Sequence, residues 1–521
     1  MHTPEEEAHR RLIEAMLNGA FYDHPAADVT LIETHISWVF LAGEFVYKVK
    51  KSLDFGFLDF STLAKRKFCC QEELRLNRRL APELYLDVVA IGEDAEGLHL
   101  HGQPVCEYAV KMRRFDQQQQ LDEMLRAGDL SAEKMDRFAE LMADFHGRTC
   151  VAEPASHYGT ASVVYAPVEQ NFYQIRSHLP DGQLEGQVNR LAAWSHTAYK
   201  RLQDTLARRK AQGFIRECHG DAHLANMAWY HDGPVFFDCI EFNADLRWID
   251  VMNEVAFLVM DLEDRGRHDL GWRFLNRYLE RTGDYPGLLV LQFYKVYRAL
   301  VRAKVACLRL AQSGLTDTER EADLKLVRSY LNLAERDTQP REPQLILTHG
   351  LSGSGKSTFV NQLAPQVGAV CLHSDHERKR LFGFAANENS RSPIHGGIYS
   401  AQAGRTTYTH LHDLTDTLLG AGVTTIVDAT FLKRQDRERF KQLADRHQVA
   451  LTLLDFSVPE AELRRRIRLR AEQGMAVSEA GEEVLDLQIE AADALNEAEK
   501  TWRIGIVPST RVKDVAEILT I

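Results

Sequence analysis

The chain has 521 residues, of which 45% are hydrophobic and 26% charged, and its formal net charge is −12. This composition is ordinary for a soluble globular protein, and the length predicts about two to four domains. The acidic balance argues against broad binding to nucleic acid or to an anionic membrane surface.

The sequence lacks the marks of an exported or membrane protein. Its first residues, MHTPEEEAHRRL, are acidic and have no apolar core of the kind that a signal peptide needs. The most apolar stretch, residues 286–301, is interrupted by Lys295 and Arg298. The eight cysteines form no CxxC pair, which favours reduced thiols. We therefore expect a cytoplasmic protein without membrane contact; its oligomeric state stays open.

The first part of the chain is predicted to fold as a small β-rich lobe, about residues 1–112, and a helical lobe, about 116–338. The segments ISWVFL and EFVYKVK alternate apolar and polar residues around Ala42-Gly43-Glu44 and predict a β-hairpin. A helix is predicted over 62–80. The strand in EYAVKMRRF, residues 107–115, is expected to lead from one lobe to the other and to hold adenine.

Residues 219–227, HGDAHLANM, allow three interpretations. His219, Asp221 and His223 alternate and are suited to bind one metal ion. A hydrolase site would need a nucleophile, and no GxSxG motif lies nearby. The third interpretation makes Asp221 the base that accepts a hydroxyl proton and Asn226 a magnesium ligand, because protein kinases place Asp and Asn five residues apart for these roles.

The phosphotransfer interpretation requires further residues, and the sequence supplies them in the expected order. Lys48 in the strand FVYKVK is placed to bind phosphates, and Glu73 on the following helix to hold it. Asp238 follows the apolar strand PVFF as a second metal ligand, and Asp250 begins an apolar helix where it can brace the loop. Lys50 shares a strand face with Lys48 and Glu72 adjoins Glu73, so either assignment can shift.

On these residues the first part, about 1–338, resembles the aminoglycoside phosphotransferase group of the protein-kinase-like fold, in which HGDxxxxN replaces HRDxxxxN. The resemblance implies a bilobal kinase fold that binds ATP and Mg²⁺. It does not identify the acceptor. Two features depart from the pattern: no GxGxxG loop precedes Lys48, so Ser37 and the nearby backbone would cover the phosphates, and the sequence after Asp238 lacks the usual glycine.

The polar segment AERDTQPREPQ at 334–344 predicts a boundary near 338, so a second domain covers 339–521. Beyond it, short apolar strands alternate with helical segments, which predicts a parallel sheet flanked by helices. Between the first strand and helix lies GLSGSGKST, a match to G-x-x-x-x-G-K-[ST], whose backbone N–H groups cradle phosphates. Its expected nucleotide-binding residues are Gly350, Gly353, Ser354, Gly355, Lys356, Ser357 and Thr358, with Ser357 also binding magnesium.

Other candidate residues follow later strands of the second domain. Asp375 comes directly after the second strand, where it can serve as base beside Arg378 or merely cap a helix. Asp428 ends the third strand and is placed to act on the magnesium. Arg466 and Arg470 share one helix face and can neutralise transferring phosphate.

This part resembles the small P-loop kinases of the shikimate, gluconate and polynucleotide 5′-kinase type, including the zeta-toxin and chloramphenicol phosphotransferase branches. The resemblance implies that Asp375 activates an acceptor hydroxyl and that Arg466 or Arg470 is a lid arginine.

The whole sequence thus predicts an ATP- and magnesium-dependent phosphotransferase with two ATP sites and small-molecule hydroxyl acceptors. In the main alternative, one domain, more readily the first because it lacks a glycine loop, is a nucleotide-binding regulatory or interaction module. The other domain then acts alone, and nucleotide-sugar or polynucleotide ends are further possible acceptors; the acidic charge argues against the polynucleotide.

Overall fold

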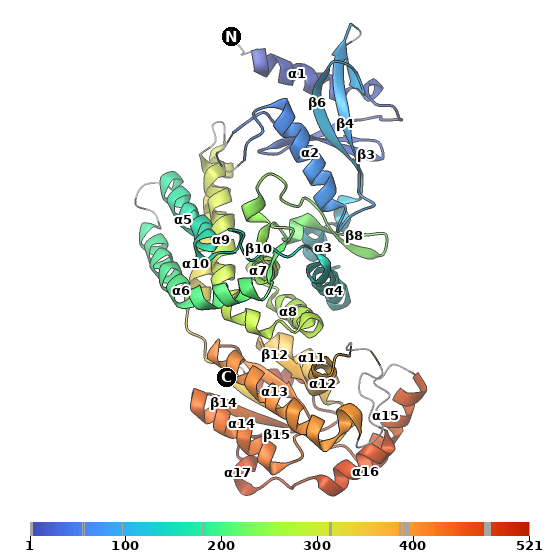
Figure 1. The fold of residues 1–521 in the computed structure, drawn as a ribbon, viewed down its shortest axis with the longest axis vertical. Helices are drawn as coiled ribbons and strands as arrows, with labels where there is room; N and C mark the ends of the chain where they lie inside the picture. The colour runs from blue at the N-terminus through green and yellow to red at the C-terminus, as the bar shows by residue number, and fades with distance from the viewer. Residues whose placement is uncertain are drawn as a thin grey trace. The chain divides into compact units, whose positions relative to one another are not determined.

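A computed structural model of the protein describes most of the chain (Figure 1). The described residues are 4–54, 56, 58–95, 97–179, 182, 184–311, 315–384, 388, 396–473 and 481–519, without the side chains of 4–6 and 470–473. Contacts divide the chain into two compact units: Met1–Pro167 with Gln203–Leu258, and Val168–Leu202 with Val259–Ile521. Residue 338 lies inside the second unit.

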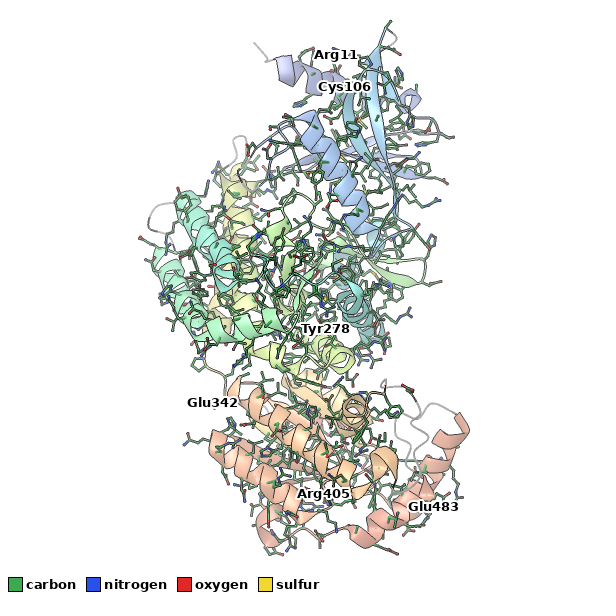
Figure 2. The ribbon with its side chains drawn as sticks, viewed as in Figure 1. Arg11, Cys106, Tyr278, Glu342, Arg405 and Glu483 are labelled. Carbon is green, nitrogen blue, oxygen red and sulfur yellow. The ribbon has the colours of Figure 1, made fainter. Side chains whose placement is uncertain are left out.

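The first unit contains a six-stranded antiparallel sheet in the order β1-β2-β3-β6-β4-β5. Helix α1 (Pro4–Leu17) packs its apolar residues into the core of this sheet. Arg11 of α1, labelled in Figure 2, pairs with Glu93 of the sheet. The strands are β1 (Thr30–Glu33), β2 (Ser37–Ala42), β3 (Phe45–Lys50), β4 (Tyr85–Asp94), β5 (Gly97–Leu100) and β6 (Val105–Arg113).

The predicted hairpin is confirmed: β2 and β3 pair antiparallel, with Ala42 opposite Phe45. Gly43 in the turn has a φ of +59°, and a Cβ there would lie 2.4 Å from the Pro25 carbonyl oxygen. Glycine avoids both the strained conformation and the clash. Because side chains alternate along β3, Lys48 and Lys50 lie on the same face of the sheet.

The predicted helix after the hairpin is also confirmed as α2 (Leu63–Asn77), which packs against β6 and β4. The Thr62 hydroxyl caps it by accepting the Lys65 N–H at 3.3 Å. Its buried face carries Cys69, Cys70 and Leu76, and among them the fully buried Glu73. The helix therefore turns a carboxylate toward the sheet, a placement that needs a cation nearby.

Two short antiparallel pairs of strands hold the loops of the first unit. β7 (Ile215–Glu217) pairs with β10 (Trp248–Asp250), and β8 (Met227–Tyr230) pairs with β9 (Gly233–Phe236). Residues 219–227 therefore lead from one pair to the other. Helices α3 (Leu121–Ala127) and α4 (Ala132–Arg148) belong to the same unit, and α4 packs against β9.

Three helices run across the division of the units: α5 (Ala161–His178), α6 (Glu185–Ala211) and α7 (Val251–Asp264). Within the second unit, α8 (His268–Thr282) precedes the closely packed pair α9 (Leu288–Leu310) and α10 (Asp317–Thr338). Tyr278 of α8 lies among crowded side chains (Figure 2) and is 1% exposed.

The second unit also contains a five-stranded parallel sheet in the order β12-β13-β11-β14-β15. The strands are β11 (Gln344–His349), β12 (Val370–His373), β13 (Thr425–Asp428), β14 (Ala450–Phe456) and β15 (Arg503–Ile506). Helix α11 packs against α18, and α13 packs against α14. The helices of this region are α11 (Lys356–Val367), α12 (Ser374–Leu381), α13 (Ala401–Gly420), α14 (Arg434–His447), α15 (Glu460–Gln473), α16 (Glu482–Ala491), α17 (Glu497–Lys500) and α18 (Val512–Leu519).

The predicted fold class is confirmed in both of its parts. The first part contains an antiparallel sheet with a packed helix, followed along the chain by helical segments, and a parallel sheet flanked by helices comes after them. All eight cysteines are free thiols. Among the described helices, none is long and apolar enough to cross a bilayer.

Candidate functional site

Lys48 on β3 lies between two carboxylates that come from distant parts of the sequence. Its Nζ donates to Glu73 Oε1 at 2.9 Å and to Asp238 Oδ1. The Asp238 side chain is 45% exposed, whereas that of Glu73 is fully buried. Lys48 is therefore anchored by Glu73 from within and faces the open side of the site through Asp238.

Lys50 occupies the buried side of the same cluster. Its Nζ donates to Glu73 Oε2 at 2.7 Å and to Glu241, and it lies 4.9 Å from the ring centre of Phe60. The Lys50 side chain is completely buried. The structure thus gives the two lysines different positions: Lys48 reaches the open site, and Lys50 neutralises carboxylates beneath it.

This cluster keeps the anchoring carboxylate ionised. Burial by itself would raise the pKa of Glu73, but the ammonium groups of Lys48 and Lys50 lower it to about 2. Burial outweighs the same ammonium groups at Glu241, whose pKa is raised. Glu72 points elsewhere, to Arg75 at 2.8 Å, so Glu73 is the residue that holds the lysines.

The HGD loop brings Asp221 and Asn226 into direct contact. Asn226 Nδ2 donates to both the carbonyl oxygen and Oδ2 of Asp221, each at 3.0 Å. The Asn226 amide therefore fixes the Asp221 carboxylate, and its own carbonyl oxygen Oδ1 is the atom that it can offer to a cation. His223 Nε2 lies 3.4 Å from Asp221 Oδ2.

His219 shapes this loop through its ring. Nδ1 accepts the Asp221 N–H at 3.3 Å, and Nε2 lies 2.9 Å from the Phe237 carbonyl oxygen, to which it donates. Burial lowers the pKa of His219, which favours this neutral form. Both ring nitrogens are engaged by the backbone, so His219 is not free to join Asp221 and His223 around a metal ion.

Asp238 reaches the same place from the β8–β9 hairpin. The Phe237 N–H donates to the Asn226 carbonyl oxygen at 3.0 Å, so the two loops lie side by side. Asp238 has a φ of +62°, and its N–H donates to the Tyr85 hydroxyl at 3.0 Å. The strained backbone turns the carboxylate toward Lys48.

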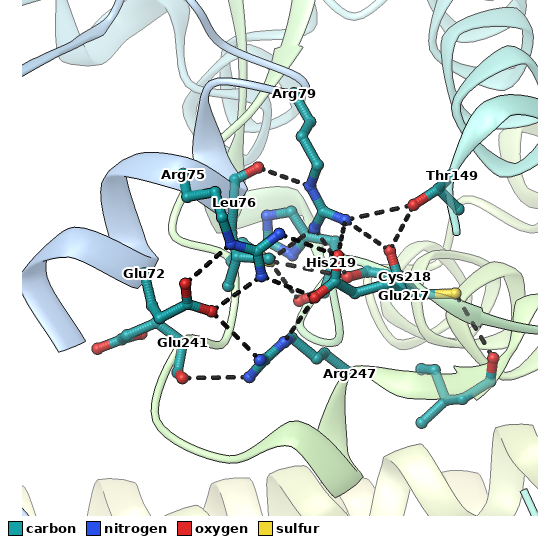
Figure 3. Close-up of polar contacts among 12 residues, drawn as sticks. Glu72, Arg75, Leu76, Arg79, Thr149, Glu217, Cys218, His219, Glu241 and Arg247 are labelled. Atoms are coloured by element: carbon teal, nitrogen blue, oxygen red, sulfur yellow. Dashed lines mark hydrogen bonds and ion pairs between the residues drawn. The ribbon is translucent and has the colours of Figure 1, made fainter. Parts of the chain in front are cut away.

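Ion pairs to the buried carboxylate of Glu217 attach α2 to the strand that precedes the HGD loop (Figure 3). Glu217 of β7 accepts from Arg75 at 2.8 Å, from Arg79 at 3.1 Å and from Arg247 at 3.3 Å. Although burial opposes it, these guanidinium groups lower the pKa of Glu217. The helix that carries Glu73 is thereby held next to the loop that carries Asp221.

Glu254 of α7 supports the loop directly, whereas Asp250 of β10, the brace expected from the sequence, pairs with Arg209 of α6. Asp250 accepts two hydrogen bonds from Arg209, at 2.7 and 2.8 Å. Glu254 accepts the His219 N–H at 2.9 Å and lies 3.2 Å from His146 Nε2. His146 is thus a buried partner of the loop support and has no access to the open site.

The turn before β2 occupies the position at which protein kinases have a glycine-rich loop, which this sequence lacks. Thr34 Oγ1 accepts the Ser37 N–H at 2.9 Å and donates to the Ser37 carbonyl oxygen at 3.0 Å. The Ser37 side chain is fully buried. The Ser37 hydroxyl therefore does not face the open side of the site.

The GLSGSGKST segment forms a loop between β11 and α11. Gly350, Gly353 and Gly355 have φ values of +140°, +85° and +93°, which residues with a Cβ rarely adopt. Lys356 Nζ donates to the carbonyl oxygens of Gly350 and Leu351, both at 2.9 Å. The lysine thus lies across its own loop.

Ser357 and Asp428 form the proposed metal-binding edge of this loop. Ser357 Oγ donates to Asp428 Oδ2 at 2.5 Å, and His373 Nδ1 lies 2.8 Å from the same oxygen. Burial would raise the pKa of Asp428, but His373, Lys356 and Ser357 lower it. A hydroxyl beside an ionised carboxylate is a hard oxygen pair of the kind that Mg²⁺ prefers.

The remaining residues of the second site lie around this loop. Asp375, in the first turn of α12, is 2.6 Å from Arg378 Nη1, and its side chain is 29% exposed. Arg466 Nη1 lies 3.5 Å from the carbonyl oxygens of Gly353 and Ser354. The side chain of Arg470 lies outside the described residues.

Several contributors were not anticipated from the sequence. Glu241 and Glu217 were missed because only the fold brings them to Lys50 and to the arginines. Gln488 of α16 was missed as well: it accepts the Ser352 N–H at 2.8 Å and donates to the Ser352 hydroxyl at 2.9 Å. A weak signal existed for Glu241, which follows Asp238 by three residues in DCIE.

Comparisons with known proteins give one family model and several relatives. The AAA domain family model matches residues 345–495. Uncharacterized protein Rv2004c of Mycobacterium tuberculosis and Uncharacterized protein Mb2027c of Mycobacterium bovis are each 34% identical over 432 residues. These alignments cover 82% of this chain and 84% of each relative.

Among solved structures, an amicoumacin kinase covers 64% of this chain and 96% of its own, with 13% identity and a TM-score of 0.41. A choline/ethanolamine kinase family protein from Mesorhizobium loti covers 63% and 99%, with 12% identity and a TM-score of 0.37. The Mycobacterium tuberculosis APS kinase covers 35% and 97%, with 17% identity and a TM-score of 0.26. Scores this low do not establish a shared activity.

Proposed function

The chain belongs to the family of the mycobacterial protein Rv2004c, and from that premise we propose that it is an ATP- and magnesium-dependent phosphotransferase with two ATP sites. The domains are residues 1–338 and 339–521. The observation that carries the proposal is the meeting of Asp221, Asn226 and Asp238 in adjacent hydrogen-bonded loops, with Lys48 on Asp238. A second set of phosphate-binding residues follows in GLSGSGKST.

At the first site, Asp221 accepts the proton of a small-molecule hydroxyl as the hydroxyl oxygen attacks the γ-phosphorus of ATP. The bond from the γ-phosphorus to the bridging oxygen breaks, and ADP leaves. Asn226 holds the Asp221 carboxylate in place, and Lys48 orients the phosphates while Glu73 anchors it. Most of the rate enhancement then comes from positioning and charge stabilisation.

At the second site, backbone N–H groups of the loop and the N-terminus of α11 bind the phosphates. Asp375 accepts the acceptor proton, and Arg466 lies at the loop where it can neutralise charge on the transferred group. Arg470, on the same helix face in sequence, is the alternative lid arginine. The acceptor is again a small-molecule hydroxyl.

The residues that would hold Mg²⁺ through oxygen atoms are Asn226 and Asp238 at the first site and Ser357 with Asp428 at the second. These side chains supply carboxylate, amide and hydroxyl oxygens, the donors that hard cations prefer. The bound ion would neutralise phosphate charge.

The decisive experiment uses γ-labelled ATP, a desalted metabolite extract and three proteins: wild type, Asp221→Asn and Lys356→Ala. We expect label on distinct compounds, with each variant losing one and retaining the other. Asp221→Asn changes one oxygen to an amide nitrogen and leaves the side-chain shape intact, so loss of one product reports chemistry.

Two other outcomes would change the proposal. If only Lys356→Ala removes label, the first domain is a nucleotide-binding regulatory module. If each variant on its own abolishes all labelling, the sites are not independent. Label on a nucleotide-sugar or polynucleotide end would reassign the acceptor of the second domain.

A further inference from the structure

Helix α8 is built into the edge of the parallel sheet, although it precedes the predicted boundary at 338. β12 is an edge strand of that sheet. The Asn276 side chain pairs with the β12 backbone as a neighbouring strand would: Oδ1 accepts the Cys371 N–H and Nδ2 donates to the Ala369 carbonyl oxygen, both at 2.8 Å. One amide side chain thus satisfies part of the exposed edge.

A second group of contacts holds the same helix. Trp272 lies against Gly368, where an added Cβ would be 3.2 Å from the indole nitrogen. At the other end of α8, Arg380 of α12 donates to the Glu280 carbonyl oxygen. The helix is therefore fixed along its length against α11, β12 and α12.

From this position α8 extends a carboxylate toward the P-loop. Glu280 Oε1 lies 3.2 Å from His373 Nε2, at the end of β12. His373 Nδ1 lies 2.8 Å from Asp428 Oδ2, and that oxygen accepts the Ser357 hydroxyl at 2.5 Å. Each contact is direct, so a continuous line of polar contacts runs from α8 to the loop.

We propose that Glu280 is a positioning residue of the P-loop site, acting through His373 to orient Asp428 and Ser357. This inference rests on the proposed function of that site. Both ring nitrogens of His373 face a carboxylate oxygen, so the ring has one orientation that satisfies both. Without Glu280 the ring is free to rotate away from Asp428, and the oxygen pair offered to a cation loses its alignment.

The chain offers a matched control in Glu377. Its side chain is 1% exposed and, like Glu280, it is an acidic residue paired with a histidine and an arginine, here His410 and Arg380. No contact joins it to Asp428 among those that the described residues make. Because Arg380 also donates to the Glu280 carbonyl oxygen, Glu377→Gln controls for disturbance of that backbone contact, while the side-chain contacts from Glu280 through His373 and Asp428 to Ser357 stay in place.

The experiment measures Mn²⁺ binding by electron paramagnetic resonance in full-length protein saturated with AMP-PNP. Asp238→Asn is present throughout to remove a metal ligand of the other site. We expect Glu280→Gln and His373→Asn each to weaken Mn²⁺ binding about 10-fold or more, the usual effect of losing a partner of a metal ligand. The double variant should bind Mn²⁺ no more weakly than His373→Asn does, because both changes interrupt the same series of contacts from Glu280 to Asp428. Glu377→Gln should bind as its parent does.

Two results would overturn the inference while leaving the proposed function intact. One is a Glu280→Gln protein that binds Mn²⁺ like Glu377→Gln. The other is full additivity of the two changes, which would show that Glu280 acts independently of His373. If the parent protein itself shows no Mn²⁺–nucleotide binding that Lys356→Ala removes, the proposed function fails, and the inference fails with it.

Discussion

The two sites hold their lysines in opposite ways. Lys48 is bound by Glu73 and Asp238, which are contributed by a helix and a loop far apart in the sequence. Lys356 is bound by the carbonyl oxygens of Gly350 and Leu351, within its own loop. The first arrangement uses charged partners and needs the tertiary fold; the second uses backbone groups and needs only a short stretch of chain.

This difference explains why one site is readily recognised in the sequence and the other is recognised only by several residues together. A phosphate cradle of backbone N–H groups requires glycines at set spacing, which leaves a local pattern. A lysine held by carboxylates requires opposite charges from separate elements, which two lysines and three acidic residues provide here. The residues of such a cluster have no fixed spacing in the sequence.

Removal of divalent metal is expected to have the largest effect, because the proposal assigns metal ligands to both sites. With EDTA in excess over Mg²⁺, both phosphotransfer activities should fall to background, and added Mg²⁺ should restore them. Labelled-product assays measure this directly. If one activity persists in EDTA, the site responsible for it does not depend on a divalent metal, and the two sites differ in this respect.

Lys48 and Lys50 provide the sharpest pair of variants. Lys48→Ala should reduce the first activity by about 10²–10³-fold, as expected for losing one charge-stabilising group. Lys50→Ala should instead lower the free energy of unfolding by about 3–5 kcal/mol, because the buried Glu241 carboxylate loses the cation that contacts it and Glu73 keeps only Lys48. Steady-state kinetics and urea unfolding separate the two effects. Equal effects of both changes on kcat and stability would contradict the division of roles.

The same cluster predicts that the stability of the first site depends on pH in the acid range. The pKa of Glu73 is lowered from 4.5 to about 2, so its ionised form stabilises the fold above pH 4.5. That contribution is lost as the pH falls from 4.5 toward 2, on the order of 3 kcal/mol in all. Glu73→Gln should have a lower free energy of unfolding than wild type at pH 7. The difference between the two proteins should decrease as the pH falls from 4.5 toward 2.

Urea unfolding, monitored by hydrogen exchange in peptides from β3 and α2, measures the pH dependence of stability in these two elements. Glu72→Gln is the matched control, since Glu72 pairs with Arg75 outside the lysine cluster. A wild-type protein whose β3 and α2 stability is constant between pH 4.5 and 2 would argue against the ionised Glu73.

The smallest expected effect belongs to Gln488, which holds the P-loop by neutral hydrogen bonds to Ser352. Such bonds contribute about 0.5–1.5 kcal/mol each. The two bonds together contribute about 1–3 kcal/mol, so Gln488→Ala should weaken ATP binding at the second site by no more than about 100-fold. Isothermal titration calorimetry in the Asp238→Asn background checks it. A loss comparable with that of Lys356→Ala would show that this loop too depends on tertiary partners.

Local patterns in the sequence were enough for much of the fold. The hairpin around Gly43, helix α2 and the parallel sheet after residue 344 were predicted and are confirmed. Alternation, capping and glycine placement act over a few residues, so the sequence displays them. The spacing of Asp221 and Asn226 likewise reflects one tight loop, in which the two side chains are bonded.

The choice among equivalent side chains needed the tertiary structure. Sequence alone left Lys48 and Lys50 interchangeable, and also Glu72 and Glu73; burial separates them, because Lys50 and Glu73 are enclosed. It gave no sign that Glu280 of α8 reaches His373. The sequence by itself thus determined the residue types and local loops of both sites. Only the tertiary structure decided which charges meet, because a buried charge takes its partner from whatever the fold brings within hydrogen-bonding distance.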